Sequence, residues 1–190
     1  MATQQARTSD LKLFNAFIDL LNDGNQLDTI STRHLIAQAG ISKSTFYRHY
    51  ADKFAFYNWV ADYLLSQLQE TVQEAQTPLI FYRRYFEKCQ AYRQAYKSFI
   101  VNQHWLGFEQ RLLEEGMTNY TAILSKINQP DIPVANIASY IVAAHVGMAL
   151  NWLRTDGTST PDELANQLTR LTTGALAAFN INFANLFQLK

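Results

Sequence analysis

The 190-residue chain is 48% hydrophobic, 13% aromatic and 17% charged, and its formal net charge is zero. This composition can bury a sizeable core, and it excludes a disordered chain and a globally basic nucleic-acid-binding protein. Seven Gly and four Pro are too few for an all-β protein rich in turns, so the composition favours an all-α fold.

The first expected helix runs from Thr8 to about Asn22, and Gly24 ends it. Its apolar residues recur at spacings of three and four, namely Leu11, Phe14, Ile18 and Leu21. Ser31 suits the N-cap of a short second helix, and Gly40 supplies the left-handed residue that ends this helix.

A third short helix follows Ser42, which can cap it. Phe46 and Tyr50 are four residues apart and are expected to face the core. The helical period then places polar side chains on another face: Lys43, Ser44, Tyr47 and Arg48, with Thr45 and His49 at its flanks. These residue types donate hydrogen bonds to phosphates and base edges.

A long fourth helix is expected from Asp52 to about Ala75, a length of roughly 36 Å at 1.5 Å per residue. It is long enough to join two domains. Pro78 suits the first turn of the next helical segment, which is unusually aromatic. We expect this segment to break between Tyr96 and Gly107.

A further helix ends in the loop NQPDIP, and the next runs from Val134 to Arg154. That helix is apolar on two faces, one with Ile137, Ile141, Met148 and Trp152 and the other with Ala138, Val142, Ala149 and Leu153. It must be covered on two sides, either with the help of a second copy or inside one chain. Thr160 and Pro161 begin the last helix, which is expected to carry one apolar stripe of Leu164, Leu168, Leu171, Ala175, Phe179 and Phe183.

The second and third helices are joined by a Gly-containing turn, as in a helix-turn-helix, whose second helix fits the major groove of B-DNA. The alternative is an ordinary solvated polar helix. The three N-caps of this region favour DNA, because each helix N-terminus can hold a phosphate. Tyr47 and His49 are costly choices for a purely solvated surface. Residues 31–53 also carry four basic residues and one acid, a net charge of +3 in a neutral chain.

The segment TRHLIAQAGISKSTFYRHYADKFAFYNWV resembles the N-terminal domain of the tetracycline-repressor (TetR) family of bacterial transcription regulators. The matching elements are the AGIS turn, the STFYRHY recognition helix and the DK pair that opens the fourth helix. The strong resemblance covers about residues 8–60. Farther along, VGMALNWLRTDGTSTPDELA looks like the penultimate loop region of one subset of the family.

The resemblance implies an all-α fold in two parts. Residues 1–54 would form a three-helix helix-turn-helix DNA-binding domain, and residues 55–190 a larger helical domain that binds an effector and dimerises. The implied DNA contacts are Lys43, Ser44, Thr45, Tyr47, Arg48 and His49, with Thr32 and Arg33 at the start of the second helix and Lys53 at a phosphate. The implied function is a repressor that a small apolar or aromatic effector releases from a palindromic operator.

The effector site is expected among aromatic and polar side chains of the second domain: Tyr82, Tyr85, Phe86, Phe99, His104, Trp105, Met117 and His145. Aromatic residues at helical spacing also form plain core, and the sequence leaves both interpretations open. Homodimerisation would pair the last two long helices with their symmetry mates in a four-helix interface.

Two other classes of function remain. An enzyme is disfavoured, because Cys89 has no base near it in sequence and neither an HExxH motif nor a Gly-rich phosphate loop occurs. We therefore expect no catalysis, no cofactor and no metal site. The stronger alternative is a DNA-bound adaptor whose C-terminal domain binds a protein partner.

The sequence also predicts a cytoplasmic protein outside the membrane. A single cysteine suits a reducing compartment, and the start of the chain lacks the apolar core of a signal peptide. The most apolar window, YIVAAHVGMALNWL, is shorter than the roughly 20 residues that span a bilayer.

Overall fold

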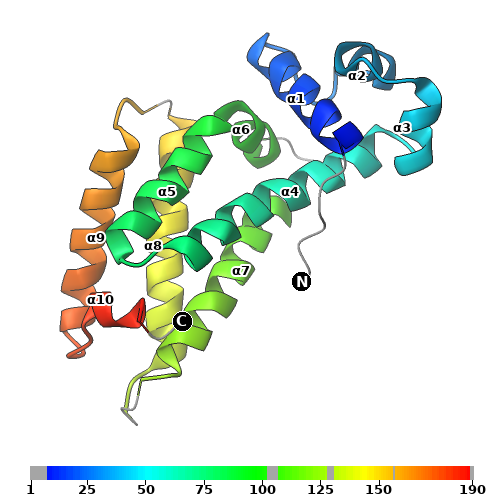
Figure 1. Cartoon of the computed structure of the whole chain (residues 1–190). Coiled ribbons are helices and arrows are strands. Elements are labelled where there is room, and N and C mark those ends of the chain that lie inside the picture. The colour runs from blue at the N-terminus through cyan, green and yellow to red at the C-terminus, as the bar shows by residue number, and fades with distance from the viewer. Residues whose placement is uncertain (1–7, 102–106, 128–130, 156, 189–190) are drawn as a thin grey trace. The chain divides into compact units, whose positions relative to one another are not determined.

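The computed structural model describes residues 8–101, 107–127, 131–155 and 157–188, and every regular element in these ranges is a helix (Figure 1). The elements are α1 (Thr8–Asn22), α2 (Thr32–Ala39), α3 (Lys43–His49), α4 (Lys53–Glu74), α5 (Pro78–Ala91), α6 (Arg93–Val101), α7 (Gly107–Leu124), α8 (Val134–Arg154), α9 (Pro161–Ala177) and α10 (Phe183–Leu186). The predicted all-α fold with an N-terminal helix-turn-helix is confirmed.

The contacts within the chain divide it into two compact units. Unit 1 comprises Met1–Ser66 and Gln94–Trp105, and unit 2 comprises Gln67–Arg93 and Leu106–Lys190. The helix α4 continues through both units. The functional boundary at residue 54 stays a prediction.

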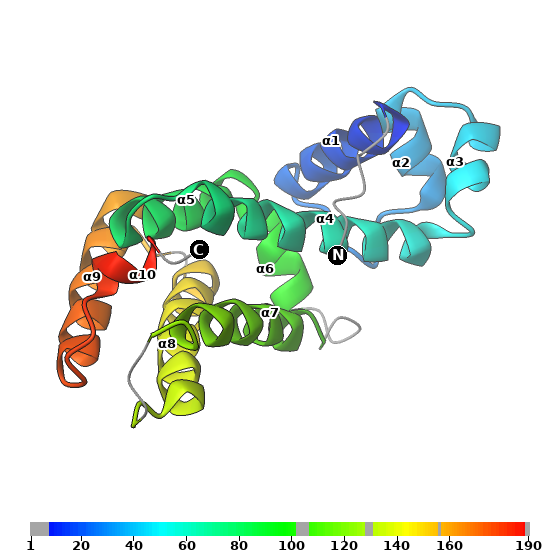
Figure 2. The same cartoon turned by 60° about the horizontal axis from the view of Figure 1, so that its bottom comes forward.

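In unit 1, α1, α2 and α3 gather around the N-terminal part of α4 (Figure 2). Their apolar faces meet in an aromatic core. Phe17, Phe46 and Phe56 are fully buried, and the rings of Phe17 and Phe56 lie 6.0 Å apart. Leu35 is the fully buried residue of the short helix α2.

The helix ends in unit 1 follow the signals in the sequence. The Ser31 and Ser42 hydroxyls accept hydrogen bonds from the first turns of α2 and α3, as N-caps do. The Asp52 carboxylate accepts from the Ala55 amide at 2.8 Å and so caps α4. Gly40 has a φ of 61° and ends α2 in the left-handed conformation.

The later helix α6 belongs to unit 1 as well. Phe99 is fully buried, and its ring centroid lies 6.3 Å from that of Phe17 on α1. The Tyr96 hydroxyl donates to the Leu64 carbonyl on α4 at 2.9 Å. A segment about 80 residues beyond α1 therefore completes the core beneath the helix-turn-helix.

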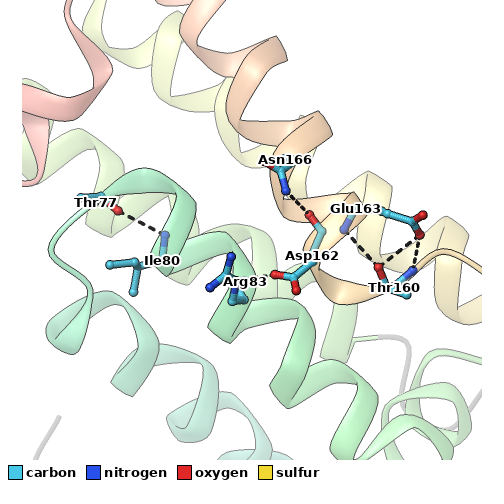
Figure 3. Close-up of polar contacts among 7 residues, drawn as sticks. All are labelled: Thr77, Ile80, Arg83, Thr160, Asp162, Glu163 and Asn166. Atoms are coloured by element: carbon cyan, nitrogen blue, oxygen red, sulfur yellow. Dashed lines mark hydrogen bonds and ion pairs between the residues drawn. The ribbon is translucent and has the colours of Figure 1, made fainter.

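In unit 2, α5 packs mainly against α9, and α7 packs mainly against α8. Figure 3 shows the polar contacts that fix the starts of α5 and α9, where Arg83 and Asp162 form an ion pair between the two helices. Thr160 and Glu163 cap each other's backbone amides in a capping box. The start predicted for α9 is thereby confirmed.

Both apolar faces of α8 are covered inside unit 2. Ile137 and Trp152 of one face are buried, and so are Val142 and Leu153 of the other. The two apolar faces of α8 therefore do not need a second copy of the chain to cover them. By length and composition alone, this helix could cross a membrane. The core helix of a globular protein has the same length and composition, and the burial of α8 fits a core helix.

The aromatic segment contains one more helix end than predicted. The predicted break between Tyr96 and Gly107 is confirmed, because α6 ends at Val101 and α7 begins at Gly107. A second break, at Tyr92, was not predicted; the next residue, Arg93, begins α6, and its side chain donates to the Trp152 carbonyl.

The last helix ends at Ala177, and the chain reverses through Asn180, which has a φ of 56°. The predicted apolar stripe was wrong at two positions. Leu171 is 59% exposed, because the buried face of α9 continues from Leu168 to Thr172 and Leu176, and Phe179, beyond the end of α9, is 43% exposed.

Candidate nucleic-acid interface

The recognition helix α3 is fixed by two aromatic residues on its inner face. Phe46 is fully buried and Tyr50 is 7% exposed, and both rings contact Phe56 of α4 at centroid distances of 6.4 and 5.3 Å. Residues four apart on a helix share one face. The rest of α3 is therefore turned away from the core.

A buried hydrogen bond adds a second anchor for α3. The Tyr50 hydroxyl donates to the carboxylate of Asp10 at 2.9 Å, and Asp10 is only 7% exposed in the first turn of α1. This pair joins residues 40 positions apart, so no local pattern in the sequence could have revealed it. It ties the end of the recognition helix to α1.

The outer face of α3 carries the predicted DNA contacts. Lys43, Ser44, Tyr47 and Arg48 are exposed, and Thr45 and His49 are half-buried at the flanks of this face. Tyr47 is 47% exposed, and the Lys43 ammonium lies 5.8 Å from its ring centroid. An exposed aromatic ring beside a cation is available to an incoming ligand. Six of the seven residues of α3 are thus exposed or half-buried, and Phe46 is its buried residue.

Two of these side chains already make contacts within the cap of α3. The Ser42 hydroxyl lies 2.8 Å from the Ser44 hydroxyl and 2.9 Å from the Thr45 hydroxyl. The same Ser42 oxygen accepts the Thr45 amide at 3.0 Å. A hydroxyl both donates and accepts, so Ser44 and Thr45 keep the capacity for one more partner.

Thr32 and Arg33 lie at the start of α2, as predicted. Arg33 is exposed and Thr32 is half-buried. Ser31 caps this end by accepting the His34 amide at 3.1 Å. The remaining free amides of the first turn are oriented as in helix N-termini that bind phosphate.

Lys53 has a structural role that the sequence did not indicate. Its ammonium donates to the carbonyls of Asp28 and Ile30, at 3.0 and 3.2 Å. One turn later, the Tyr57 hydroxyl donates to the Leu27 carbonyl at 3.0 Å. Both side chains hold the loop before α2 against α4. An ammonium has three donors, so Lys53 retains one for a phosphate.

Phe54 was missed by the sequence interpretation. Its side chain is 49% exposed in the first turn of α4, and its ring centroid lies 5.4 Å from the Lys53 ammonium. Phe54 therefore adds an exposed apolar ring beside the predicted phosphate contact Lys53. The sequence does contain a hint of this role, because Phe54 directly follows Asp52 and Lys53, the DK pair of the resemblance.

The residues predicted for the effector site are dispersed. In unit 2, Tyr82, Tyr85, Phe86 and His145 are buried and Met117 is half-buried. Phe99 lies in unit 1, in the core with Phe17. His104 and Trp105 lie outside the described residues.

A cavity in unit 2 brings two of these residues together. Its volume is about 50 Å³, and its lining includes Tyr85 and His145. Tyr82 contacts the His145 ring from the side, with the centroids 6.1 Å apart. Phe86 instead packs edge-on against Trp152, with centroids 6.0 Å apart. The effector roles of all these residues stay predictions.

One family model matches the chain by sequence, and several solved structures match it by fold. Residues 76–174, slightly more than half of the chain, match the TetR C-terminal family described as "Transcriptional regulator C-terminal region". No curated protein matches the chain by sequence.

Solved structures of transcription regulators share the fold over nearly the whole chain. The dihydroxyacetone kinase operon activator DhaS has a TM-score of 0.75 at 15% identity, over 90% of this chain and 97% of that one. A TetR-family regulator from Syntrophomonas wolfei has a TM-score of 0.66 at 19% identity, over 88% and 95%. A TetR regulator from Streptococcus agalactiae has a TM-score of 0.58 at 20% identity, over 86% and 93%.

The family model over residues 76–174 identifies a transcriptional regulator, and the solved structures share its fold. The chain belongs to the TetR family. Members of this family bind DNA and typically act as dimers. The matched proteins are regulators and not enzymes.

Proposed function

We propose that the protein is a cytoplasmic homodimeric repressor that binds a palindromic operator and is released by a small effector. The observation that carries the DNA-binding part is the polar outer face of α3, which is held by buried Phe46 and Tyr50. Direct base readout needs side chains that are both exposed and fixed in position. Lys43, Tyr47 and Arg48 meet the first condition, and the anchored helix supplies the second.

Replacing Tyr47 or Lys43 by Ala is expected to weaken operator binding by about 1–3 kcal/mol each. The reason is that each substitution removes an exposed side chain of α3. The Tyr47 ring also packs against buried Phe46, with centroids 5.3 Å apart, so circular dichroism must show that the Tyr47 variant is folded. The Tyr47→Phe variant removes the hydroxyl and keeps the ring, so it measures how much of the lost affinity is due to the hydroxyl. Fluorescence anisotropy with labelled operator DNA at fixed salt measures the change, since salt alone shifts such affinities strongly.

The matched control is Lys126→Ala, which removes one lysine charge from an exposed site in unit 2. It should leave operator affinity unchanged. Equal losses in Lys43→Ala and Lys126→Ala would mean that only the total charge matters and that α3 does not read the DNA.

Exposed apolar and small residues on α8 and α9 support the homodimer. Tyr140 is 54% exposed on α8, and exposed Ala143 and Gly147 follow it at the spacing of one helix face. On α9, Leu171 is 59% exposed and Gly174 follows three residues later. A Cβ added at Gly147 or Gly174 would meet no atom within 4 Å. Small residues beside large apolar ones allow a second copy to approach closely.

Gly147→Glu is therefore expected to weaken the dimer by about tenfold or more, because it buries a charge at the interface. The open space around Gly147 means that the single chain should still fold. Sedimentation velocity measures the change. Ala122→Glu, at an exposed position of α7, is the control and should remain dimeric. A dimer of undiminished stability in Gly147→Glu would exclude this face.

The repressor assignment and the effector are the finer parts of the proposal. One protein of similar fold is named an operon activator, so the fold by itself does not decide between repression and activation. The effector would occupy the cavity beside His145 in unit 2. Binding would have to differ between DNA-bound and free states to release the operator.

A protein-partner adaptor is the second candidate, and the small volume of the cavity beside His145 favours it. The cavity has a volume of about 50 Å³. Pockets for drug-sized ligands measure roughly 300–1,000 Å³. A larger pocket of about 450 Å³, beside Glu70 and Lys88, is lined mostly by charged and polar side chains, unlike the apolar pockets that hold small ligands. An effector screen on the purified protein–operator complex separates the two functions. Release by a small molecule alone supports the repressor, whereas release only by a second protein supports the adaptor.

A further inference from the structure

Asp10 places a carboxylate in the apolar face of α1. The other buried residues of this helix are apolar, among them Leu13, Phe14 and Phe17. Asp10 lies in the first turn and is only 7% exposed. Burying a carboxylate is costly unless other groups compensate for the lost water. The N-terminus of α1 supplies one compensation, because a helix N-terminus favours negative charge.

A second compensation comes from Tyr50, at the end of α3. Its hydroxyl donates to Oδ1 of Asp10 at 2.9 Å, and its ring packs in the aromatic core. The ring centroid lies 5.3 Å from that of Phe56 and 6.3 Å from that of Trp59. A phenylalanine would make the same ring contacts, so the hydroxyl is what links α3 to Asp10.

A buried polar pair of this kind contributes little net stability. Apolar side chains of similar size in its place are often as stable or more stable, because they avoid the loss of hydration. What the hydrogen bond adds is geometry, since it restricts the distance and the direction between its donor and its acceptor. The bond between Asp10 and Tyr50 therefore fixes where α3 ends relative to α1.

The two ends of α3 are held in different ways. Its start is capped by Ser42, which follows the turn after α2. At its end, the amide of the C-cap residue Tyr50 donates to the Phe46 carbonyl at 2.9 Å, and the hydroxyl reaches Asp10. Exposed Arg48 lies two residues before Tyr50, so its direction depends on this second anchor.

We propose that Asp10 and Tyr50 are positioning residues for base readout, because their hydrogen bond sets the direction of the second half of α3. The inference rests on the DNA-binding function proposed above and deepens it. Base contacts require a recognition helix that is fixed in the groove, whereas phosphate contacts carry no sequence information. Loss of the bond should therefore lower the preference for the operator and leave binding to random DNA unchanged.

The Tyr50→Phe variant removes the hydroxyl and keeps the ring. Two labelled duplexes of equal length are compared, a genomic fragment selected by the parent protein and a random sequence. The ratio of the two affinities should fall about three- to tenfold, the range that the loss of one hydrogen bond supports. The affinity for the random duplex and its salt dependence should match those of the parent. Fluorescence anisotropy at several salt concentrations measures both.

Tyr96→Phe is the matched control in the same unit. The Tyr96 hydroxyl also belongs to a buried side chain, and it donates to the Leu64 carbonyl at 2.9 Å. This bond joins α6 to α4 and does not involve α3. Its loss should reduce stability and leave the affinity ratio unchanged. An equal fall of the ratio in Tyr96→Phe would overturn the proposal, because any weakened core would then have the same effect.

Variants of Asp10 separate positioning from stability. Asp10→Asn keeps an acceptor oxygen, so its affinity ratio should stay within about twofold of the parent. Asp10→Leu combined with Tyr50→Phe replaces both partners by apolar groups, so this double variant should unfold near the urea midpoint of the parent. Its affinity ratio should still be about three- to tenfold lower. A parent-like ratio in the folded double variant, or a ratio in Asp10→Asn as low as in Tyr50→Phe, would contradict the assigned role.

The parent protein itself separates this inference from the proposed function. If it binds no genomic fragment better than the random duplex, the DNA-reading function fails and the positioning role fails with it. If it prefers one fragment and Tyr50→Phe keeps the full preference, the positioning role alone fails.

Discussion

Phe99→Ala is expected to lower the free energy of unfolding by about 3–5 kcal/mol, the range for a large aromatic deleted from a core. Phe99 is fully buried and packs against Phe17. Its loss removes apolar burial and leaves a cavity where α6 meets α1. Urea unfolding followed by circular dichroism measures the effect. If Phe99 instead lined an effector site, the substitution would cost little stability.

Phe54→Ala is the matched control, because it deletes the same side chain from a site that is 49% exposed. Its unfolding free energy should stay within about 0.5 kcal/mol of the parent protein. A Phe99→Ala protein as stable as Phe54→Ala would show that α6 does not contribute to the core of unit 1.

A second large effect is expected from pH. The pKa of His145 is lowered to about 4 by burial, from an ordinary value of 6.5. Between these two pH values the unfolded chain takes up a proton and the folded protein does not. Stability contributed by this residue is therefore complete above pH 6.5 and is lost as the pH falls toward 4. The loss amounts to about 3 kcal/mol, at about 1.4 kcal/mol for each pKa unit.

The His145→Gln variant isolates this contribution, because all other titrating groups are shared. Urea unfolding of both proteins at pH 7 and near pH 4.5 should show the parent losing about 2–3 kcal/mol more than the variant. Parallel losses in the two proteins would mean that His145 is not buried as a neutral group.

Local signals made the helix-turn-helix readable from the sequence. Ser31, Ser42 and Asp52 cap their helices, and Gly40 takes the left-handed conformation that ends α2. Each of these effects acts within about four residues and depends on one side chain. The helical period also predicted which side chains of α3 face outward, because Phe46 was expected to face the core.

Features that depend on residues far apart in the chain could not be predicted from the sequence. The interruption at Tyr92 has no glycine or proline, and Arg93 owes its position to Trp152, which is 59 residues away. The Asp10–Tyr50 hydrogen bond spans 40 residues. Phe99 looked like one more aromatic of the C-terminal region, yet it packs in unit 1.

The candidate effector site was only partly predictable for a similar reason. Aromatic spacing identified Tyr82, Tyr85 and Phe86 as inward-facing, and all three are buried. Spacing could not tell which buried side chains border empty space, because that depends on how α5, α7 and α8 pack together. Of the three, only Tyr85 lines the cavity.

The central claim is that α3 reads a palindromic operator as part of a dimer. DNase footprinting on genomic fragments selected by the purified protein tests it most directly, with the Lys43→Ala/Tyr47→Ala double variant as control. We predict protection of two inverted half-sites whose centres lie one helical turn, about 10–10.5 base pairs, or a multiple of it apart. The double variant should lose this protection while remaining folded. Protection no stronger than on random DNA of equal length at the same salt, or an unchanged footprint in the double variant, would contradict the claim.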